Sequence, residues 1–408
     1  MPGPMEGIKV LEVAEFTFTP SAGAVLADWG AEVVKVEHAV RGDAQRGIKL
    51  GTGGSAAGSF QPLMEHPNRG KKSIGIALET ESGRALLDQL VLQSDVFVTN
   101  FLPNARKKLR LDPEDVQGVN PSIIYARGSA LGPNGPEADN GGYDLSVFWC
   151  RGGSAAGATA AGSPRIAEMP AGAYGDSMGG MTIAGGIAAA LLKRERTGEA
   201  SVVDVSLLSM ATWATALSIG NALLVGRDPS PEPLDGPVWR TFNPIVGTFR
   251  TADNRFVNLT MLQPGRYWAD VCRHIAREDA IEDPRFATAE TLMANANDAG
   301  QIVAEAIGAK PYRFWAKRFR TLKGQWSLVQ TPLEVAADPQ VRANNYILRV
   351  IDDQGAEREL VSSPVQFDES VFEITRAPQF AEHTDEIVRS LGTTDEELIQ
   401  LKIEGAIT

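Results

Sequence analysis

Short apolar runs alternate with helix-like segments at the start of the chain, and this alternation constrains the fold more than any other feature of the sequence. Each run is too short for a helix, and its Val-rich composition suits a parallel strand covered on both faces. Strands that alternate with helices predict a Rossmann-like, doubly wound α/β sheet. We assign these strands to residues 8–14, 31–37, 73–78, 95–101 and 122–132.

Aromatic and polar residues follow several of the predicted strands. In a doubly wound sheet, ligands bind beyond the carboxyl ends of the strands. The residues at such ends are Phe16, Thr17, Phe18, His38, Asn100 and Phe101. No GxGxxG follows the first strand, so the common dinucleotide fingerprint is absent and a nicotinamide dehydrogenase is disfavoured.

The character of the sequence changes after residue 225. A long apolar helix predicted over 207–225 leads into a Pro-rich loop, and then a hairpin is expected to turn at Asp253 and Asn254. Helical segments follow, and the α/β pattern resumes after Leu328. We therefore predict a large Rossmann-like domain made from both chain ends and a smaller α+β domain between them, with bounds 1–225, 226–327 and 328–408.

Composition excludes several classes of function. The formal net charge of −12 argues against nucleic-acid binding, which needs a basic field. Two cysteines cannot form a disulfide framework, and the four histidines lack metal-ligand spacing. No apolar run approaches the length that spans a bilayer, and the N-terminus lacks the apolar core of a signal peptide. We expect a cytoplasmic protein with no bound metal and no membrane anchor.

The stretch from Ala171 to Leu208 carries the strongest candidate for chemistry, Asp176. A Gly- and Ala-rich helix is predicted over 178–193, followed by a buried strand, so Asp176 lies at the helix start. There it is either an ordinary N-cap or a carboxylate that the helix dipole keeps ionised for reaction. Glycines on both sides (Gly175, Gly179 and Gly180) leave room for a bulky group to approach it.

Segments along nearly the whole chain, in order, resemble the class III CoA-transferases, a family that includes formyl-CoA and carnitine CoA-transferases and the α-methylacyl-CoA racemases. Each segment alone is weakly specific, whereas the ordered set is strongly so. The segments are MEGIKVLEVAEF, LADWGAEVVKVEH, RGDAQRG, PNRGKKSIGIAL, SDVFVTNF, GGYDLSVFW, GDSMGGMTIAGGIAAALLKRERTG, DVSLLSMA, TADNRFVNLT, EVAADPQVRANN and APQFAEHTDEIV.

The resemblance implies an interlocked homodimer and a CoA-transferase that holds no permanent cofactor, with coenzyme A and a carboxylic acid as substrates. It implies that Asp176 attacks an acyl-CoA, giving first a mixed aspartyl anhydride and then an aspartyl-CoA thioester. Backbone N–H groups at a turn formed by Gly179 and Gly180 are candidates for an oxyanion site.

The resemblance also assigns a set of CoA-contacting residues. It places Phe16 and Thr17 in the loop after the first strand, and Asn100 and Phe101 near the pantetheine. The set is completed by His38, Lys72, Ile76, Lys108 and Tyr143. Without the resemblance, the two phenylalanines could be core aromatics, and Lys71, Lys72 and Lys108 could be solvated surface charges.

Departures from the family pattern bear on the reaction. Glu79 and Leu102 stand where the family often has Lys and Arg, which puts CoA contacts near them in doubt. In the racemases, a histidine at the position of Tyr143 works with the aspartate as a two-base pair. Tyrosine is a poor base at neutral pH, and no other histidine is expected near Asp176. CoA transfer is therefore favoured over α-methylacyl-CoA racemisation.

Overall fold

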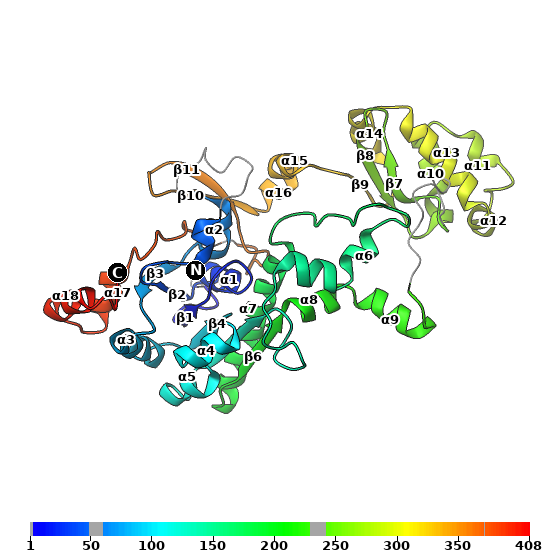
Figure 1. Ribbon diagram of the computed structural model, residues 1–408. Coiled ribbons are helices and arrows are strands. Elements are labelled where there is room, and N and C mark those ends of the chain that lie inside the picture. Colours follow the sequence, from blue (N-terminus) through cyan, green and yellow to red (C-terminus); the bar gives the residue numbers. More distant parts are fainter. Residues whose placement is uncertain (1–2, 49–59, 229–241, 371) are drawn as a thin grey trace. The chain divides into compact units, whose positions relative to one another are not determined.

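The computed structural model describes residues 3–48, 60–228, 242–370 and 372–408. The chain forms two compact units (Figure 1). The larger comprises residues 1–159, 165–229 and 340–408, so it is made from both chain ends, and the smaller comprises residues 160–164 and 230–339.

A six-stranded parallel sheet in the order β3-β2-β1-β4-β5-β6 forms the centre of the larger unit. This is the doubly wound order, with the chain reversing direction across the sheet between β1 and β4. The predicted α/β sheet is therefore confirmed. Its strands are β1 (Lys9–Val13), β2 (Glu32–His38), β3 (Lys72–Ile76), β4 (Val96–Thr99), β5 (Ile124–Ser129) and β6 (Val202–Ser206).

Alternate side chains of the strands enter two different cores. Val96 and Val98 of β4 pack in one core with α1 and α7, whereas Phe97 between them packs in the other with α3, α5, α17 and α18. All three side chains are fully buried. Because helices cover both faces of these Val-rich strands, both faces are apolar. The strands therefore appear in the sequence as continuous apolar runs.

The helices of the larger unit alternate with its strands in the first half of the chain. They are α1 (Pro20–Asp28), α2 (Pro62–Asn68), α3 (Glu81–Leu92), α4 (Pro103–Leu109), α5 (Pro113–Val119), α6 (Ser154–Ala158), α7 (Tyr174–Thr197), α8 (Leu207–Ala214), α9 (Ala216–Val225), α17 (Thr384–Ser390) and α18 (Asp395–Ile403). A 3₁₀ turn covers Ala44–Gly47 and a π-helix covers Leu145–Arg151.

Three local expectations differ from the structure. The helix that carries Asp176 begins at Tyr174, before the predicted start. The apolar segment 207–225 is two helices, α8 and α9, bent by 68° at the break. The strand predicted to be buried is β6, an edge strand whose side chains alternate in exposure, with Val202 43% exposed. Residues at every second position of a strand share one face, so the apolar residues at those positions of β6 cover only one of its two faces.

The C-terminal segment returns to the sheet. The backbone N–H of His383 donates to the Ser73 carbonyl oxygen at the start of β3, and Ile407 forms a bridge with Ile76 at its end. In Figure 1 the red C-terminal helices therefore lie beside the blue N-terminal strands. A two-stranded hairpin of β10 (Ile347–Ile351) and β11 (Glu357–Val361) precedes them, after α16 (Pro339–Ala343).

The smaller unit has an antiparallel sheet in the order β7-β8-β9, packed on helices. Its hairpin turns through Asn254, which has a positive φ of 60°. Residues 328–339 lie in this unit, whereas the sequence assigned them to the large domain. Its elements are β7 (Val246–Arg250), β8 (Phe256–Thr260), α10 (Pro264–His274), α11 (Asp279–Glu282), α12 (Ala289–Ala294), α13 (Ala296–Gly308), α14 (Tyr312–Arg318), a 3₁₀ turn (Phe319–Thr321), β9 (Trp326–Leu328) and α15 (Pro332–Ala337).

Across the residues that the structure describes, no single helix is long and apolar enough to cross a membrane. The bent pair α8 and α9 meets the criteria of length and composition when its two helices are taken together.

Candidate active site

The loops after β1 and β4 meet where the sheet reverses direction, which is where doubly wound sheets bind ligands. Asn100, directly after β4, holds the loop after β1 by two hydrogen bonds. Its Oδ1 accepts from the Glu15 backbone N–H at 3.0 Å, and its Nδ2 donates to the Glu15 carbonyl oxygen at 2.7 Å. Asn100 therefore joins the two central loops.

Phe16 follows in a strained backbone conformation. Its φ is 67°, in the left-handed region that bulky residues rarely occupy. Its N–H donates to Asp43 Oδ1 at 3.1 Å, and its ring meets that of Tyr143 edge-on, with the centroids 5.6 Å apart. The surrounding contacts thus hold an aromatic ring at the mouth of the site at a cost in backbone strain.

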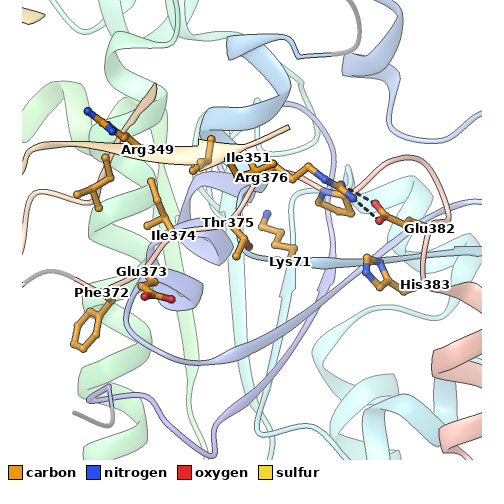
Figure 2. A pocket seen from close by; sticks show the side chains of 13 residues that line it. Lys71, Arg349, Ile351, Phe372, Glu373, Ile374, Thr375, Arg376, Glu382 and His383 are labelled. Atoms are coloured by element: carbon orange, nitrogen blue, oxygen red, sulfur yellow. Dashed lines mark hydrogen bonds and ion pairs between the residues drawn. The ribbon is translucent and has the colours of Figure 1, made fainter. Parts of the chain in front are cut away.

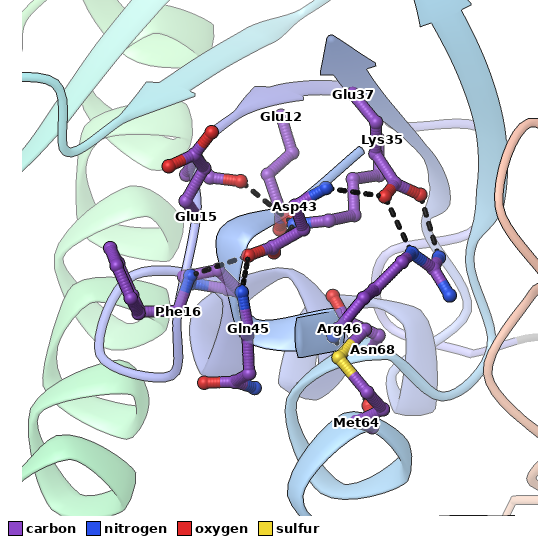
Figure 3. A network of polar contacts seen from close by, with 12 residues as sticks. Glu12, Glu15, Phe16, Lys35, Glu37, Asp43, Gln45, Arg46, Met64 and Asn68 are labelled. Atoms are coloured by element: carbon purple, nitrogen blue, oxygen red, sulfur yellow. Dashed lines mark hydrogen bonds and ion pairs between the residues drawn. The ribbon is translucent and has the colours of Figure 1, made fainter. Parts of the chain in front are cut away.

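A buried network of charges lies beside this loop (Figure 3). Lys35 Nζ lies 2.9 Å from Asp43 Oδ2 and 3.2 Å from Glu12 Oε1, and it donates to the Ala14 carbonyl oxygen at 2.7 Å. Burial alone would raise the pKa of Asp43, but the Lys35 ammonium outweighs it and the pKa is lowered. Asp43 is therefore an anion that accepts from Phe16.

Lys71 belongs to the same network, which corrects its reading as a surface charge. Its ammonium is fully buried and lies 2.7 and 2.6 Å from the two carboxylate oxygens of Glu12. Burial lowers the pKa of Lys71 to about 7, despite the Glu12 charge. A buried cation of this kind depends on its paired anion.

A cavity of about 630 Å³ opens at the junction of these loops. Its lining combines aromatic and apolar side chains with several polar and charged groups. The lining includes Phe16, Phe18, Asn100, Phe101, Leu102, Arg106, Arg127, Ala130, Tyr143, Ser146, Asp176 and Leu207. Predicted residues from the ends of β1 and β4 are thus brought together with Asp176 and Tyr143.

Asp176 is the third residue of α7, so it is not the N-cap of the helix. The carboxylate of Asp144 accepts from the Gly175 N–H instead, at 3.0 and 3.2 Å. Burial, followed by the negative charge of Asp144, raises the pKa of Asp176 to about 7. The helix start was expected to favour the ionised form, but the pKa shift has the opposite direction because desolvation outweighs the dipole.

The glycines around Asp176 serve packing rather than access. A Cβ at Gly179 would lie 2.1 Å from the Phe18 ring, and one at Gly180 would lie 2.3 Å from Ser21 Cβ of α1. Both glycines are buried inside α7, so they form no turn, and neither lines the cavity. The placement of these two residues gives no support to the predicted oxyanion site.

A histidine contacts Ser177, the residue that follows Asp176 in the chain. His66 of α2 has its Nε2 3.0 Å from Ser177 Oγ. Because the Ser177 hydroxyl donates to the Ala173 carbonyl oxygen, the imidazole must donate to Ser177. Burial and the charge of Arg69 lower the pKa of His66 to about 4, so it is a neutral donor.

Several predicted contacts lie away from the cavity. Lys72 is the first residue of β3, so it lies at the amino end of that strand, and it pairs with Glu386 at 2.8 Å. It is therefore not part of the candidate site. Ile76 is fully buried, and Thr17 is buried with its hydroxyl donating to Gln45 Oε1. Lys108 is exposed on α4 and remains available to a phosphate.

His38 is held at the end of β2 without lining the cavity. Its Nδ1 accepts from the backbone N–H groups of Val40 and Arg41, so its Nε2 carries the proton toward Glu79 Oε1 at 3.2 Å. Glu79, which departs from the family pattern, is therefore the hydrogen-bond partner of His38.

Sequence reasoning missed other residues of the site. Ser146 and Arg127 line the cavity, and Arg127 is paired with Asp204. Asp144 was overlooked although it directly follows Tyr143, and its pairing with a helix 31 positions away has no local signal.

A second cavity of about 720 Å³ lies between β10 and residues 372–383 (Figure 2). Several of its charged groups are engaged with one another or with the buried network, since Arg376 pairs with Glu382 at 2.6 Å and Lys71 pairs with Glu12. Within the described ranges, no three His, Cys, Asp or Glu side chains are grouped as a metal ion requires. The cavity that contains Asp176 is therefore the candidate active site.

Known proteins share this architecture and sequence. The model of CoA-transferase family III matches residues 5–384. The (R)-2-hydroxy-4-methylpentanoate CoA-transferase of Clostridioides difficile is 30% identical over 405 residues, covering 98% of each chain. The cinnamoyl-CoA:phenyllactate CoA-transferase of Clostridium sporogenes is 30% identical over 400 residues, covering 97% of this chain and 95% of the other.

A solved structure with the same fold supports the same family assignment. A solved CAIB/BAIF family protein from Brucella suis superposes with a TM-score of 0.79 and 26% identity, covering 96% of this chain and 100% of that one. The match of the family model spans the loops after β1 and β4, the Asp176 helix and the whole of the smaller unit. With a match of that extent, the chain belongs to CoA-transferase family III.

Proposed function

We propose that this protein transfers CoA from an acyl-CoA to a carboxylic acid by covalent catalysis on Asp176. The observation that carries the proposal is that the Asp176 carboxylate lines the cavity at the reversal point of the sheet while Asp144 takes the capping role. A carboxylate is both a competent nucleophile and a good leaving group, as double displacement requires.

The reaction balances without an added cofactor. An Asp176 oxygen attacks the thioester carbonyl, the C–S bond breaks, and CoA thiolate leaves behind a mixed anhydride. The thiolate then attacks the Asp176 carbonyl carbon and expels the donor acid, which gives an aspartyl-CoA thioester. An acceptor carboxylate attacks that thioester, the C–S bond breaks, and a second mixed anhydride forms between Asp176 and the acceptor. The released thiolate then attacks the acceptor carbonyl of this anhydride, which gives the new acyl-CoA and expels the Asp176 carboxylate.

Coenzyme A is proposed to lie along the loops after β1 and β4. Phe16, Phe101 and Tyr143 offer aromatic surface to the pantetheine, and exposed Lys108 offers a charge to a phosphate. The two relatives above are named for acids or acyl groups that carry branched or aromatic chains. Apolar 2-hydroxy acids and their thioesters are therefore the first substrates to test.

The decisive variant is Asp176→Asn. An amide cannot form the anhydride, so we expect transfer to be lost while the fold is kept. Asp139→Asn is a matched control, because Asp139 lines the same cavity but is exposed. Wild-type enzyme treated with acyl-CoA and then hydroxylamine should gain mass on the peptide containing Asp176. An Asp176→Asn enzyme that transfers CoA at the wild-type rate would end this proposal.

We also propose a homodimer, as the family resemblance implies. Large apolar side chains of α8 and α9 are exposed in the single chain, with Trp213 80%, Leu217 92% and Leu224 84% exposed. Apolar surface of this extent on neighbouring helices suits burial against a second copy. Light scattering should give a dimer that persists on dilution to nanomolar concentration, and an active monomer would contradict it.

A further inference from the structure

We propose that Asp144 is a positioning residue of the reaction, which takes the free N–H groups at the start of α7 and so leaves the Asp176 carboxylate unbound in the cavity. This inference rests on the proposed role of Asp176 as the nucleophile. It assigns the two neighbouring carboxylates different tasks, one structural and electrostatic, the other chemical.

The geometry around Asp144 is closely fitted. Its side chain is 6% exposed and accepts from the Gly175 N–H with both carboxylate oxygens, at 3.2 and 3.0 Å. A Cβ at Gly175 would lie 2.5 Å from Asp144 Oδ1 and 2.3 Å from the Phe148 ring. Gly175 is therefore the residue whose missing side chain lets this carboxylate reach the helix.

The π-helix Leu145–Arg151 provides this placement. Asp144 directly precedes it, and Phe148, one turn further on, packs under Gly175. π-Helices are rare and are often found at functional sites. Tyr143, which directly precedes Asp144, lines the cavity, so a cavity residue and the cap of α7 are adjacent at the start of this π-helix.

The consequence for Asp176 is a carboxylate without stabilising partners. An acidic residue in the first turn of a helix ordinarily gains from the free N–H groups and the dipole. In the described part of the chain, only burial and the charge of Asp144 act on Asp176, and both raise its pKa. Burial also raises the pKa of Asp144, but N–H groups of Tyr174, Gly175 and Asp176 oppose this.

Other titratable groups occupy the elements around α7, and each has a partner of its own. None of them acts as a charge on Asp176. They are His66 with Ser177, Asp28 with Arg69, Arg127 with Asp204, Arg194 with Asp95, and Arg151 with Glu137. Asp144 is thus the charge whose removal should change the titration of Asp176.

The test needs no knowledge of the substrate. A water-soluble carbodiimide with glycine ethyl ester modifies protonated carboxyl groups, and mass spectrometry of the Asp176 peptide gives the rate from pH 5 to 8.5. We expect wild-type modification to fall with a midpoint near pH 7. Asp144→Asn keeps an acceptor for the helix but loses the charge, and should lower the midpoint by on the order of one pH unit. An unmoved midpoint would overturn the inference.

A second variant guards against misfolding. Gly175→Ala removes no ionisable group, but its Cβ would displace the Asp144 carboxylate, so it should lower the midpoint in the same direction. Circular dichroism checks the fold of both variants. If Asp176→Asn abolishes transfer while both midpoints stay unmoved, the positioning role fails and the nucleophile stands. If Asp176→Asn remains active, the proposed function itself has failed.

Discussion

Replacing Asp176 by Asn should stabilise the protein, and increasingly so as the pH rises. Asp176 is a largely buried acid whose pKa is raised from 3.8 to about 7, chiefly by burial. The folded protein therefore holds this proton more tightly than the unfolded chain does. Asn has nearly the same shape but no proton to lose, so the variant removes the cost of ionising a carboxylate in the cavity.

The sign and size of this change in the free energy of unfolding follow from the linkage between proton binding and folding. Below about pH 4 the carboxyl is neutral in both states and costs nothing. Between pH 4 and 7 the unfolded chain ionises first, so wild-type stability falls as pH rises, and above pH 7 the cost is complete. One pKa unit corresponds to about 1.4 kcal/mol, which gives about 4 kcal/mol in total. About 3 kcal/mol of this develops between pH 5 and 8.5.

Urea unfolding of wild type and Asp176→Asn at one protein concentration, repeated from pH 5 to 8.5, measures the difference in free energy of unfolding. Contributions from all other titrating groups largely cancel in that difference. Asp139→Asn, a substitution at an exposed position of the same cavity, is measured alongside as the control for replacing Asp by Asn. A difference for Asp176→Asn that changes by less than about 1 kcal/mol over this range would refute the reasoning from burial.

Other perturbations probe the packing and the reaction. Gly180→Ala should lower the free energy of unfolding by about 1–3 kcal/mol, since its Cβ would lie 2.3 Å from a side chain of α1. Gly185→Ala in the same helix meets nothing within 4 Å and should raise it by about 0.5–1 kcal/mol, so equal effects in urea would contradict the close packing. Lys71→Met should cost about 3–5 kcal/mol because it leaves buried Glu12 undercompensated, and an unchanged melting temperature would argue against that pair. An α-methylacyl-CoA incubated in D₂O should gain no α-deuterium above a heat-killed control, whereas exchange abolished by Tyr143→Phe would favour a racemase.

Features set by local sequence could be predicted. The strands follow from short apolar runs, and Phe16 and Asn100 were placed correctly at strand ends because parallel strands bring those ends to one edge. Lys71 and Lys72 show the limit of prediction from local sequence. They are adjacent and chemically identical, yet one is fully buried on Glu12 and the other pairs with Glu386 at the surface.

Features set by distant residues could not be predicted. The partner of Lys71 lies 59 positions away, and the cap of the Asp176 helix comes from 31 positions earlier. Because Asp144 occupies the cap, the usual inference from an acidic residue at a helix start gave the wrong ionisation for Asp176. The glycines beside Asp176 were interpreted as leaving room for a substrate. In the structure, Gly179 and Gly180 instead let the Phe18 ring and α1 pack closely against α7.

If Asp176 is the nucleophile, as we propose, its pKa of about 7 has a consequence for the order of events in transfer. In a mixed anhydride between Asp176 and an ordinary carboxylic acid of pKa about 4 to 5, the donor carboxylate is the weaker base and the better leaving group. CoA thiolate attack at the aspartyl carbonyl expels that better leaving group, whereas attack at the acyl carbonyl must expel Asp176. The same preference operates when an acceptor anhydride forms, so the aspartyl-CoA thioester should be the covalent state that accumulates. Rapid acid quenching and mass spectrometry should therefore find CoA, rather than the acyl group, attached to the Asp176 peptide. Asp144→Asn, by lowering the pKa of Asp176, should reduce that thioester fraction, and a larger fraction in the variant would contradict the electrostatic role given to Asp144.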